Sequence, residues 1–319
     1  MALPRSGSGP EGLCPLQPVG STFQGVVHIR EFLSVKSPRQ ILKTRGIRLR
    51  KSMGQHFLAD PNVAAMIVRR AQFNPDDVVL EIGAGIGALT LPLAQQVKHV
   101  LAVEPDRKIA AILGNELSAE GICNVTIIEK DILQCDIEAL AAKSDAPFKV
   151  LGNLPYNISS QVLVRLIHYR QVIESAFLTF QKEVAERLAA KHGNKSYGRL
   201  SVLIQYCAEI YPLVQVAASA FFPKPKVDSQ VVGIEFHHPV SFQATDEDFL
   251  FQIVRAAFGK RRKTLKNALL GSNLEFGDEG ISAALELAEI DSRRRAETLS
   301  VKEFVALSNH LQGLRLDLQ

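Results

Sequence analysis

The sequence predicts an α/β fold, in which a doubly wound and mostly parallel sheet is followed by a smaller, all-helical C-terminal domain. Two observations lead to this prediction. Short apolar runs typical of buried strands alternate with helical patterns as far as residue 236, and such alternation implies parallel strands with helices on both faces of the sheet. After residue 238 the strand patterns stop and only helical patterns follow, which indicates a domain boundary there.

The elements are expected in the following order. A short basic helix begins at Pro38 and ends at Gly46. Asp60 is a good N-cap for a second helix, because Val63 and Ile67 recur after it at helical spacing. Strands are expected over residues 78–82, 99–104, 125–128, 148–152, 176–180 and 231–236. Helices are expected over 89–96, 108–117, 249–257, 264–270, 281–288 and 301–311, and 201–216 is expected to run from helix into strand.

Composition limits the class of protein. With 46% hydrophobic and 22% charged residues, the chain can bury a core as a soluble globular protein. No apolar run approaches the ~18 residues needed to cross a bilayer. Residues 1–35 are rich in Gly, Pro and Ser and lack the apolar stretch of a secretory signal. We therefore expect residues 1–35 to be a disordered extension and the protein to be cytoplasmic and monomeric.

Neither a disulfide framework nor a metal site is expected. The four cysteines show no CxxC spacing, which excludes a zinc ribbon and fits a reducing compartment. His237 and His238 are adjacent and therefore point in different directions on a strand, and no cluster of Cys, Asp or Glu joins them. Cys207 lies in an apolar segment and is interpreted as a core thiol.

Basic charge is concentrated in two segments, whereas the formal net charge of the whole chain is only +4. Residues 1–50 carry eight Lys and Arg against two acidic residues, and residues 251–270 carry six Lys and Arg with no acidic residue. Two such segments suggest a polyanionic partner, with solvated helix faces as the alternative. The second segment consists of Arg255, Lys260, Arg261, Arg262, Lys263 and Lys266.

A glycine-rich turn, GluIleGlyAlaGlyIleGly (81–87), directly follows the strand over 78–82. Glycines such as Gly83 and Gly85 permit unusual dihedral angles and let the backbone approach a ligand closely. The turn alone is compatible with a dinucleotide, an adenosyl ligand or tight packing. Glu104, at the end of the second strand, could accept hydrogen bonds from both hydroxyls of a ribose, and this favours a nucleoside ligand.

Two further groups follow the next strands. Asp131 could accept a hydrogen bond from the exocyclic amine of an adenine or cap the following turn, and both alternatives remain open. After the fourth strand come Asn153, Leu154, Pro155 and Tyr156. The Asn153 side-chain oxygen and the Leu154 carbonyl are two acceptors that could draw the lone pair of an aromatic amine out of conjugation, while the Tyr156 ring stacks the base.

At these residues the chain resembles the S-adenosylmethionine-dependent methyltransferases of the rRNA adenine N6-dimethyltransferase family. The resemblance extends from about residue 38 to the C-terminus. Its motifs, in order, are LysSerMetGlyGlnHisPheLeu (51–58), the glycine turn (81–87), Glu104, Asp131, GlyAsnLeuProTyrAsnIleSer (152–159), GlnLysGluVal (181–184), TyrGlyArgLeuSerVal (197–202), PheProLysProLysValAspSer (222–229), LysArgArgLysThrLeu (260–265) and ArgAlaGluThrLeu (295–299).

The resemblance implies a Rossmann-like methyltransferase domain over residues 36–238 and a helical RNA-binding domain over 239–319. His56 replaces the asparagine of the family's GlyGlnAsnPheLeu segment, which closes over the cofactor. The residues implied to bind S-adenosyl-L-methionine are His56, Leu58, Gly83, Gly85, Glu104, Asp131 and Asn153. Those implied to act on the target adenine are Asn153, Leu154 and Tyr156, and the basic segment from Arg255 to Lys266 is implied to bind RNA.

The implied reaction is N6-dimethylation of two adjacent adenosines in a hairpin near the 3′ end of small-subunit rRNA, within a pre-ribosomal small subunit. No metal is called for. One alternative is methylation of large-subunit rRNA, as in a sister group, and another is a ribosome-assembly factor whose binding role outweighs catalysis. A nicotinamide-dependent oxidoreductase with the same glycine turn is a rival class, but it would give no role to AsnLeuProTyr (153–156) or to the basic segment.

Overall fold

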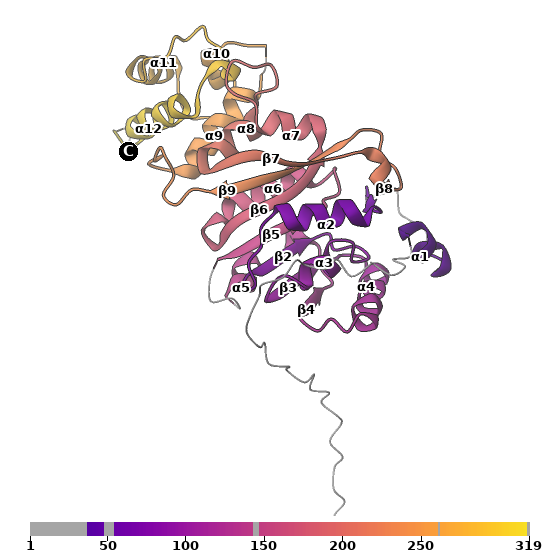
Figure 1. Cartoon of the computed structure of the whole chain (residues 1–319). Helices are drawn as coiled ribbons and strands as arrows, with labels where there is room; N and C mark the ends of the chain where they lie inside the picture. The colour runs from indigo at the N-terminus through magenta and orange to yellow at the C-terminus, as the bar shows by residue number, and fades with distance from the viewer. Residues whose placement is uncertain (1–36, 48–53, 143–146, 261, 318–319) are drawn as a thin grey trace, which may run out of the picture. The chain divides into compact units, whose positions relative to one another are not determined.

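A seven-stranded sheet is the central feature of the computed structural model, which describes residues 37–47, 54–142, 147–260 and 262–317 (Figure 1). The strand order is β4-β3-β2-β5-β6-β9-β7. The first five strands in this order are parallel, whereas β9 is antiparallel to β6 and β7 is antiparallel to β9. The predicted doubly wound, mostly parallel sheet is therefore confirmed. The expected extension over residues 1–35 lies outside the described residues.

Two strands, β6 and β9, are longer than the apolar runs alone indicate, whereas β2, β4 and β5 have the predicted bounds. A separate antiparallel pair, β1 with β8, was not predicted. Pro212 lies in the edge strand β7 beside a register shift, which an edge strand tolerates because it has a free side. The strands are β1 (Phe57–Leu58), β2 (Val78–Ile82), β3 (His99–Val103), β4 (Val125–Ile128), β5 (Phe148–Gly152), β6 (Ile173–Gln181), β7 (Ala208–Val216), β8 (Phe221–Phe222) and β9 (Ser229–Phe236).

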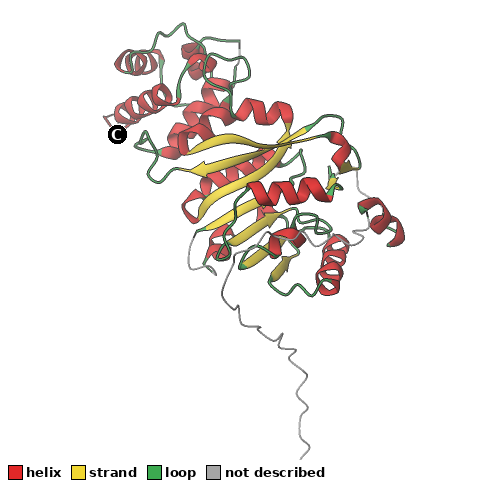
Figure 2. Cartoon of the chain, viewed as in Figure 1, coloured by secondary structure: helices red, strands yellow, loops and turns green. Residues whose placement is uncertain are grey.

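Helices cover both faces of the sheet, as Figure 2 shows. Successive β2 residues point to opposite faces, so Val79 joins an apolar cluster with α2, α3 and α4, while Leu80 joins one with α5, α6 and α8. Asp60 caps α2 as predicted, because its Oδ1 accepts hydrogen bonds from the Asn62 and Val63 amides. The helices up to α8 are α1 (Pro38–Thr44), α2 (Pro61–Arg70), α3 (Thr90–Ala94), α4 (Arg107–Ala119), α5 (Ile137–Ala141), α6 (Ser159–His168), α7 (Lys182–Leu188) and α8 (Arg199–Cys207).

The expected change from strands to helices after residue 238 is observed. The later helices are α9 (Glu247–Phe258), α10 (Leu265–Leu270), α11 (Asp278–Leu287) and α12 (Val301–Asp317). Ile253 of α9 and Phe304 of α12 belong to the same apolar cluster as Ile204 of α8, so the core continues from the sheet into these helices. That residues 239–319 act as a separate RNA-binding domain stays a prediction.

The N-terminal described segment packs on the loop that follows β2. Helix α1 buries Ile41 and Leu42 against Phe57 of β1 and Ile86 of the glycine-rich turn. The strand pairing of β1 with β8 then places Leu58 opposite Phe221. These contacts bring residues 54–58 over the ends of the parallel strands.

Candidate active site

A pocket lies at the carboxyl ends of four neighbouring parallel strands, β2, β3, β4 and β5. Ligands of doubly wound sheets bind at this edge, because loops from adjacent strands meet there. The pocket is lined by Gln55, His56, Phe57, Ile82, Gly83, Val103, Glu104, Pro105, Asp131, Ile132, Asn153, Pro155 and Ile158. Five of the residues predicted for the cofactor and the target adenine are among them, each within three residues after a strand or in the segment around β1.

Four predicted residues do not line the pocket directly. Leu58 and Leu154 are buried, at 4% and 3% exposure. Gly85 acts through its hydrogen bond to Glu104, and Tyr156 lies beside the pocket against His56. The apolar lining was not predicted from the sequence, and it includes Phe57, Pro105, Ile132, Pro155 and Ile158. Most of these residues lie within two positions of a predicted polar residue. This closeness in the sequence could have identified them as part of the pocket lining.

The glycine-rich turn is closely surrounded by backbone and side-chain atoms that exclude larger residues. Gly83 and Gly85 have φ values of +76° and +58°, which side-chain-bearing residues rarely adopt. A Cβ atom on Gly83 would lie 3.1 Å from the Asn153 carbonyl oxygen, and one on Gly85 would lie 3.1 Å from Cδ1 of Phe57. The turn therefore packs directly between the loop after β5 and the segment around β1.

Glu104 is a buried carboxylate tied to the same turn. Its Oε2 accepts a hydrogen bond from the Gly85 amide and its Oε1 accepts one from the Asp106 amide, both at 3.0 Å. Burial raises the pKa of Glu104, and the two amide hydrogen bonds oppose that increase. A carboxylate oxygen has more than one lone pair, so each oxygen can still accept a hydrogen bond from a ligand hydroxyl in the pocket.

Glu81, the first residue of the glycine motif, lies beneath the turn and is 1% exposed. Its Oε2 has no hydrogen-bond partner among the described residues. Burial raises the pKa of this carboxyl to about 8, the Thr90 hydroxyl opposes the shift, and the negative charge of Glu104 adds to it. Glu81 is therefore mostly protonated at neutral pH, whereas Glu104 has hydrogen bonds that favour its charged form.

Asp131 caps the turn that follows it, which is one of its two expected roles. Its Oδ1 accepts a hydrogen bond from the Leu133 amide at 2.9 Å and so caps the short 3-10 helix Ile132–Gln134. Asp131 also lines the pocket, and its Oδ2 accepts no hydrogen bond from the described residues. The cap and a ligand contact are compatible, because they use different oxygens.

The loop after β5 presents an oriented amide. Asn153 Nδ2 donates to the backbone oxygen of His56 at 2.9 Å, and this contact assigns the amide nitrogen to that side. The Asn153 side-chain oxygen is thereby left as an acceptor at the pocket. Next to it, the Tyr156 hydroxyl lies 2.6 Å from Oγ of the buried Ser229. Burial raises the pKa of Tyr156, so the ring carries a neutral phenol.

The described part of the basic segment lies on the surface at the end of α9 and in the loop before α10. Arg255, Lys260, Arg262 and Lys263 are exposed. Lys266 differs from them, because its ammonium is 2.9 Å from Asp278 and so already has a partner. Arg261 lies outside the described residues.

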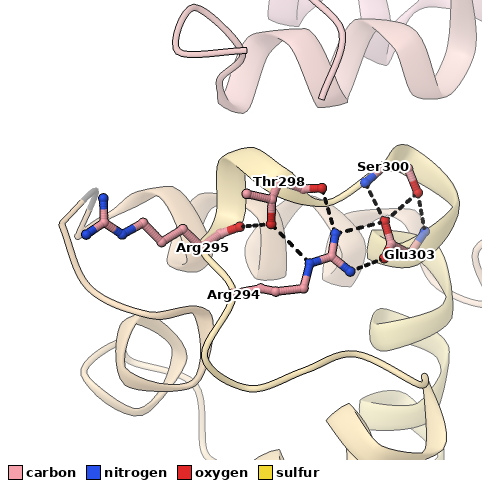
Figure 3. Close-up of polar contacts among 5 residues, drawn as sticks. All are labelled: Arg294, Arg295, Thr298, Ser300 and Glu303. Carbon is pink, nitrogen blue, oxygen red and sulfur yellow. Dashed lines mark hydrogen bonds and ion pairs between the residues drawn. The ribbon is translucent and has the colours of Figure 1, made fainter. Parts of the chain in front are cut away.

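A network of polar contacts holds the segment that precedes α12 (Figure 3). The Arg294 guanidinium pairs with the Glu303 carboxylate, which also accepts hydrogen bonds from the backbone and hydroxyl of Ser300. Arg294 further donates to the hydroxyl and carbonyl of Thr298. Because the Arg294 carbonyl accepts from the Leu265 amide at 2.7 Å, the same network fixes the start of α10 and with it the basic loop.

Two classes of site are not found in the described chain. Across the residues that the structure describes, no group of three or more His, Cys, Asp or Glu side chains could hold a metal ion. No described helix is long and apolar enough to cross a membrane.

The fold and the site together define an α/β protein with a pocket at the ends of its parallel strands, whose acceptors suit a nucleoside-like ligand. A family model described as ribosomal RNA adenine dimethylase matches residues 46–312. The chain is 47% identical to ribosomal RNA small subunit methyltransferase A of Desulforapulum autotrophicum, over 87% of this chain and 97% of that protein. It is 43% identical to the protein of the same name from Geobacillus thermodenitrificans, over 86% and 95% of the two chains. The chain therefore belongs to the ribosomal RNA adenine dimethylase family.

Solved structures agree with this assignment. A dimethyladenosine transferase from Plasmodium falciparum superposes with a TM-score of 0.67 at 27% identity, covering 79% of this chain and 95% of the other. The 23S rRNA methyltransferase ErmE superposes with a TM-score of 0.61 at 25% identity, covering 80% and 99%. Both similarities cover most of the chain, and not the sheet alone.

Proposed function

We propose that the protein transfers methyl groups from S-adenosyl-L-methionine to N6 of adenosines in small-subunit rRNA, and that it dimethylates two adjacent adenosines in a hairpin near the 3′ end. The observation that carries this proposal is the orientation of Asn153. Its amide nitrogen is held by the His56 carbonyl, which leaves its oxygen as an acceptor at the pocket that Asn153 lines. Relatives with 43–47% identity bear the name of small-subunit rRNA methyltransferases, which supports the choice of rRNA.

The pocket's donors and acceptors fit S-adenosyl-L-methionine. The bare backbone of Gly83 permits close approach, the Glu104 oxygens suit ribose hydroxyls, and Asp131 Oδ2 suits an adenine amine. When bound, the cofactor supplies an already activated methyl group on a sulfonium sulfur. The described residues contribute position and electrostatics, which are what a transfer of this kind requires.

The target adenine would be held by the loop after β5. The amine of adenine is a poor nucleophile while its lone pair is conjugated with the ring. The Asn153 oxygen and the Leu154 carbonyl accept hydrogen bonds from its two N–H groups, which draws the lone pair out of conjugation and directs it into the pocket. The Tyr156 ring provides a flat surface for the base, which must be unpaired or flipped out to reach the site.

Two basic surfaces are suited to the phosphates of the RNA. One comprises Arg255, Lys260, Arg262 and Lys263 near α9 and α10. The other is the outer face of α1, where Arg39, Lys43 and Arg45 are exposed. No acidic residue occurs in residues 37–47, so this face would attract phosphate without competition from its own helix.

The substrate within this proposal is a pre-ribosomal small subunit in the cytoplasm, bound by a monomer. Methylation of large-subunit rRNA is the second candidate, and the similarity to ErmE is the observation that favours it. The chain is 25% identical to ErmE but 43–47% identical to the small-subunit relatives, so small-subunit rRNA is the preferred substrate. An assembly role that outweighs catalysis would leave the orientation of Asn153 without a use.

Single-turnover methyl transfer to an RNA hairpin with two adjacent adenosines tests the proposal. Loss of one preorganised group that acts in the transition state typically lowers the rate by about 10²–10³. Asn153→Ala should therefore methylate about 10²–10³ times more slowly, while calorimetry shows a much smaller loss of cofactor affinity than this loss of rate. Mass spectrometry of the product should find two methyl groups on each adenosine. A near-normal rate for Asn153→Ala would show that the amine is activated by another group.

A further inference from the structure

His56 connects the two halves of the site through its backbone and its ring. Its carbonyl oxygen accepts the hydrogen bond from Asn153 Nδ2 at 2.9 Å. Its imidazole stacks on the Tyr156 ring, with ring centroids 5.4 Å apart and planes inclined by 30°. Its Nδ1 lies 2.6 Å from the carbonyl oxygen of Pro223, in the segment after β8.

The last contact determines which ring nitrogen carries the proton. A carbonyl oxygen only accepts hydrogen bonds, so Nδ1 of His56 must donate. This donor bond to Pro223 fixes the ring plane, and the fixed ring in turn covers one face of Tyr156. The opposite end of Tyr156 is held by Ser229, through the hydroxyl contact of 2.6 Å.

We propose that His56 is a positioning residue for the target adenine, and that its side chain serves Tyr156 and not the cofactor. This inference rests on the proposed function, because it requires that a base stacks on Tyr156. The imidazole stacks on one face of Tyr156, and the proposal assigns the other face to the base. The ring contacts of His56 thus stiffen the stacking surface, while its backbone orients the Asn153 amide.

Three substitutions separate the ring from the donor. His56→Phe keeps an aromatic ring and removes the Nδ1 donor, His56→Asn keeps a donor and removes the ring, and His56→Ala removes both. One aromatic contact or one hydrogen bond changes an equilibrium by about 2- to 12-fold. The single-turnover rate at saturating hairpin RNA and cofactor should fall by about that factor for His56→Phe and for His56→Asn, and by more for His56→Ala.

The partnership with Tyr156 is tested by a double-mutant cycle. If His56 acts through Tyr156, then His56→Ala should lower the rate less than about twofold further in a Tyr156→Ala background, because the ring that it supports is already gone. Full additivity of the two substitutions would contradict the inference. His238→Ala, which removes an exposed histidine after β9, is the matched control and should behave as the wild type.

Cofactor affinity is the second readout. Calorimetric titration with S-adenosyl-L-methionine should give dissociation constants within about twofold of the wild type for all three variants, since the ring contacts Tyr156 and Pro223. A loss of cofactor affinity equal to the loss of rate would assign the ring to the cofactor and overturn the inference. Failure of the wild-type protein to methylate the hairpin would instead contradict the proposed function. Normal transfer by all three variants would contradict the positioning role alone.

Discussion

Glu104 shows how much of a binding site one buried side chain can organise. Both of its oxygens already accept backbone hydrogen bonds, one from the glycine turn after β2 and one from the start of α4. The carboxylate therefore holds the turn in place before any ligand arrives. A ligand hydroxyl that reaches it meets an acceptor whose orientation is fixed, and little entropy remains to be lost on binding.

We predict that Glu104→Ala weakens binding of S-adenosyl-L-methionine. Hydrogen bonds to charged groups contribute about 1.5–3 kcal/mol, which corresponds to a dissociation constant roughly 10 to 150 times higher. Calorimetric titration measures this directly. Glu186→Ala, an exposed position on α7, is the control and should leave the constant unchanged. An unaltered constant for Glu104→Ala would remove Glu104 from the cofactor site.

Glu81 gives a pH-dependent prediction. Its pKa is raised from 4.5 to about 8 in the folded chain, so the folded state holds a proton that the unfolded state releases. The resulting stability is fully present below pH 4.5 and is lost as pH rises through about 8. Relative to Glu81→Gln, which stays neutral, the wild-type protein should therefore lose about 3–5 kcal/mol of unfolding free energy over this range.

Urea unfolding at several pH values, without cofactor, checks this difference. The two proteins should be similar near pH 5, and Glu81→Gln should be the more stable one near pH 8.5. Glu186→Gln, at an exposed position, should follow the wild type throughout. Parallel pH curves for Glu81→Gln and the wild type would mean that Glu81 keeps an ordinary pKa in the folded chain.

At the scale of elements, the central parallel strands β2, β3 and β5 were predictable because each is a short apolar run buried on both faces. The acids and glycines that follow them were also predictable, since the ends of parallel strands share one edge of the sheet. The pair β1–β8 was missed because each strand has only two residues, too few to show a period. Helix α6 was missed although Val162, Leu163, Leu166 and Ile167 show helical spacing.

The contacts of His56 could not be predicted in this way. They join residues 97 and 167 positions apart in the sequence, and they depend on where β1 and the segment after β8 fold. The ion pair of Lys266 could not be predicted for the same reason. Its place in the basic segment indicated an RNA contact, whereas its ion pair with Asp278 of α11 became visible only in the folded chain.

The basic loop before α10 leads to a prediction about salt. Each phosphate contact releases counterions, so binding of the RNA hairpin should weaken as salt rises. Replacing Lys260, Arg262 and Lys263 together with Gln should weaken binding and flatten the plot of log affinity against log salt. The slope should fall by about 0.7–0.9 for each phosphate that the loop no longer neutralises. Filter binding or anisotropy over a salt series measures both the affinity and the slope.

Lys266→Gln is the matched control for that experiment. Because its ammonium is already paired with Asp278, its replacement should change the salt slope less than replacement of any one of the exposed residues. An unchanged slope in the triple variant would mean that the loop is a solvated surface. Cofactor affinity should stay at the wild-type value in every variant, since none of these residues lines the pocket.

At the scale of the whole molecule, the C-terminal helices are joined to the sheet by a polar contact as well as by the shared core. The buried Arg170 guanidinium follows α6 and meets both oxygens of Glu247, the first residue of α9, at 2.6 and 2.7 Å. The Tyr206 hydroxyl of α8 donates to the same carboxylate at 2.9 Å. Three elements from the two predicted domains therefore meet at one charged group.

This contact predicts that the domains unfold together. Removing one partner of a buried ion pair costs about 3–5 kcal/mol, and because the Glu247 side chain is 34% exposed we expect about 2–3 kcal/mol for Glu247→Ala. Urea unfolding of the wild type should show one transition, and the variant should unfold in one transition at lower urea. Two separate transitions in the wild type would mean that residues 239–319 fold independently. In that case the shared core would not make the two parts of the chain unfold together. The basic loop would then belong to a domain that is free to move relative to the pocket.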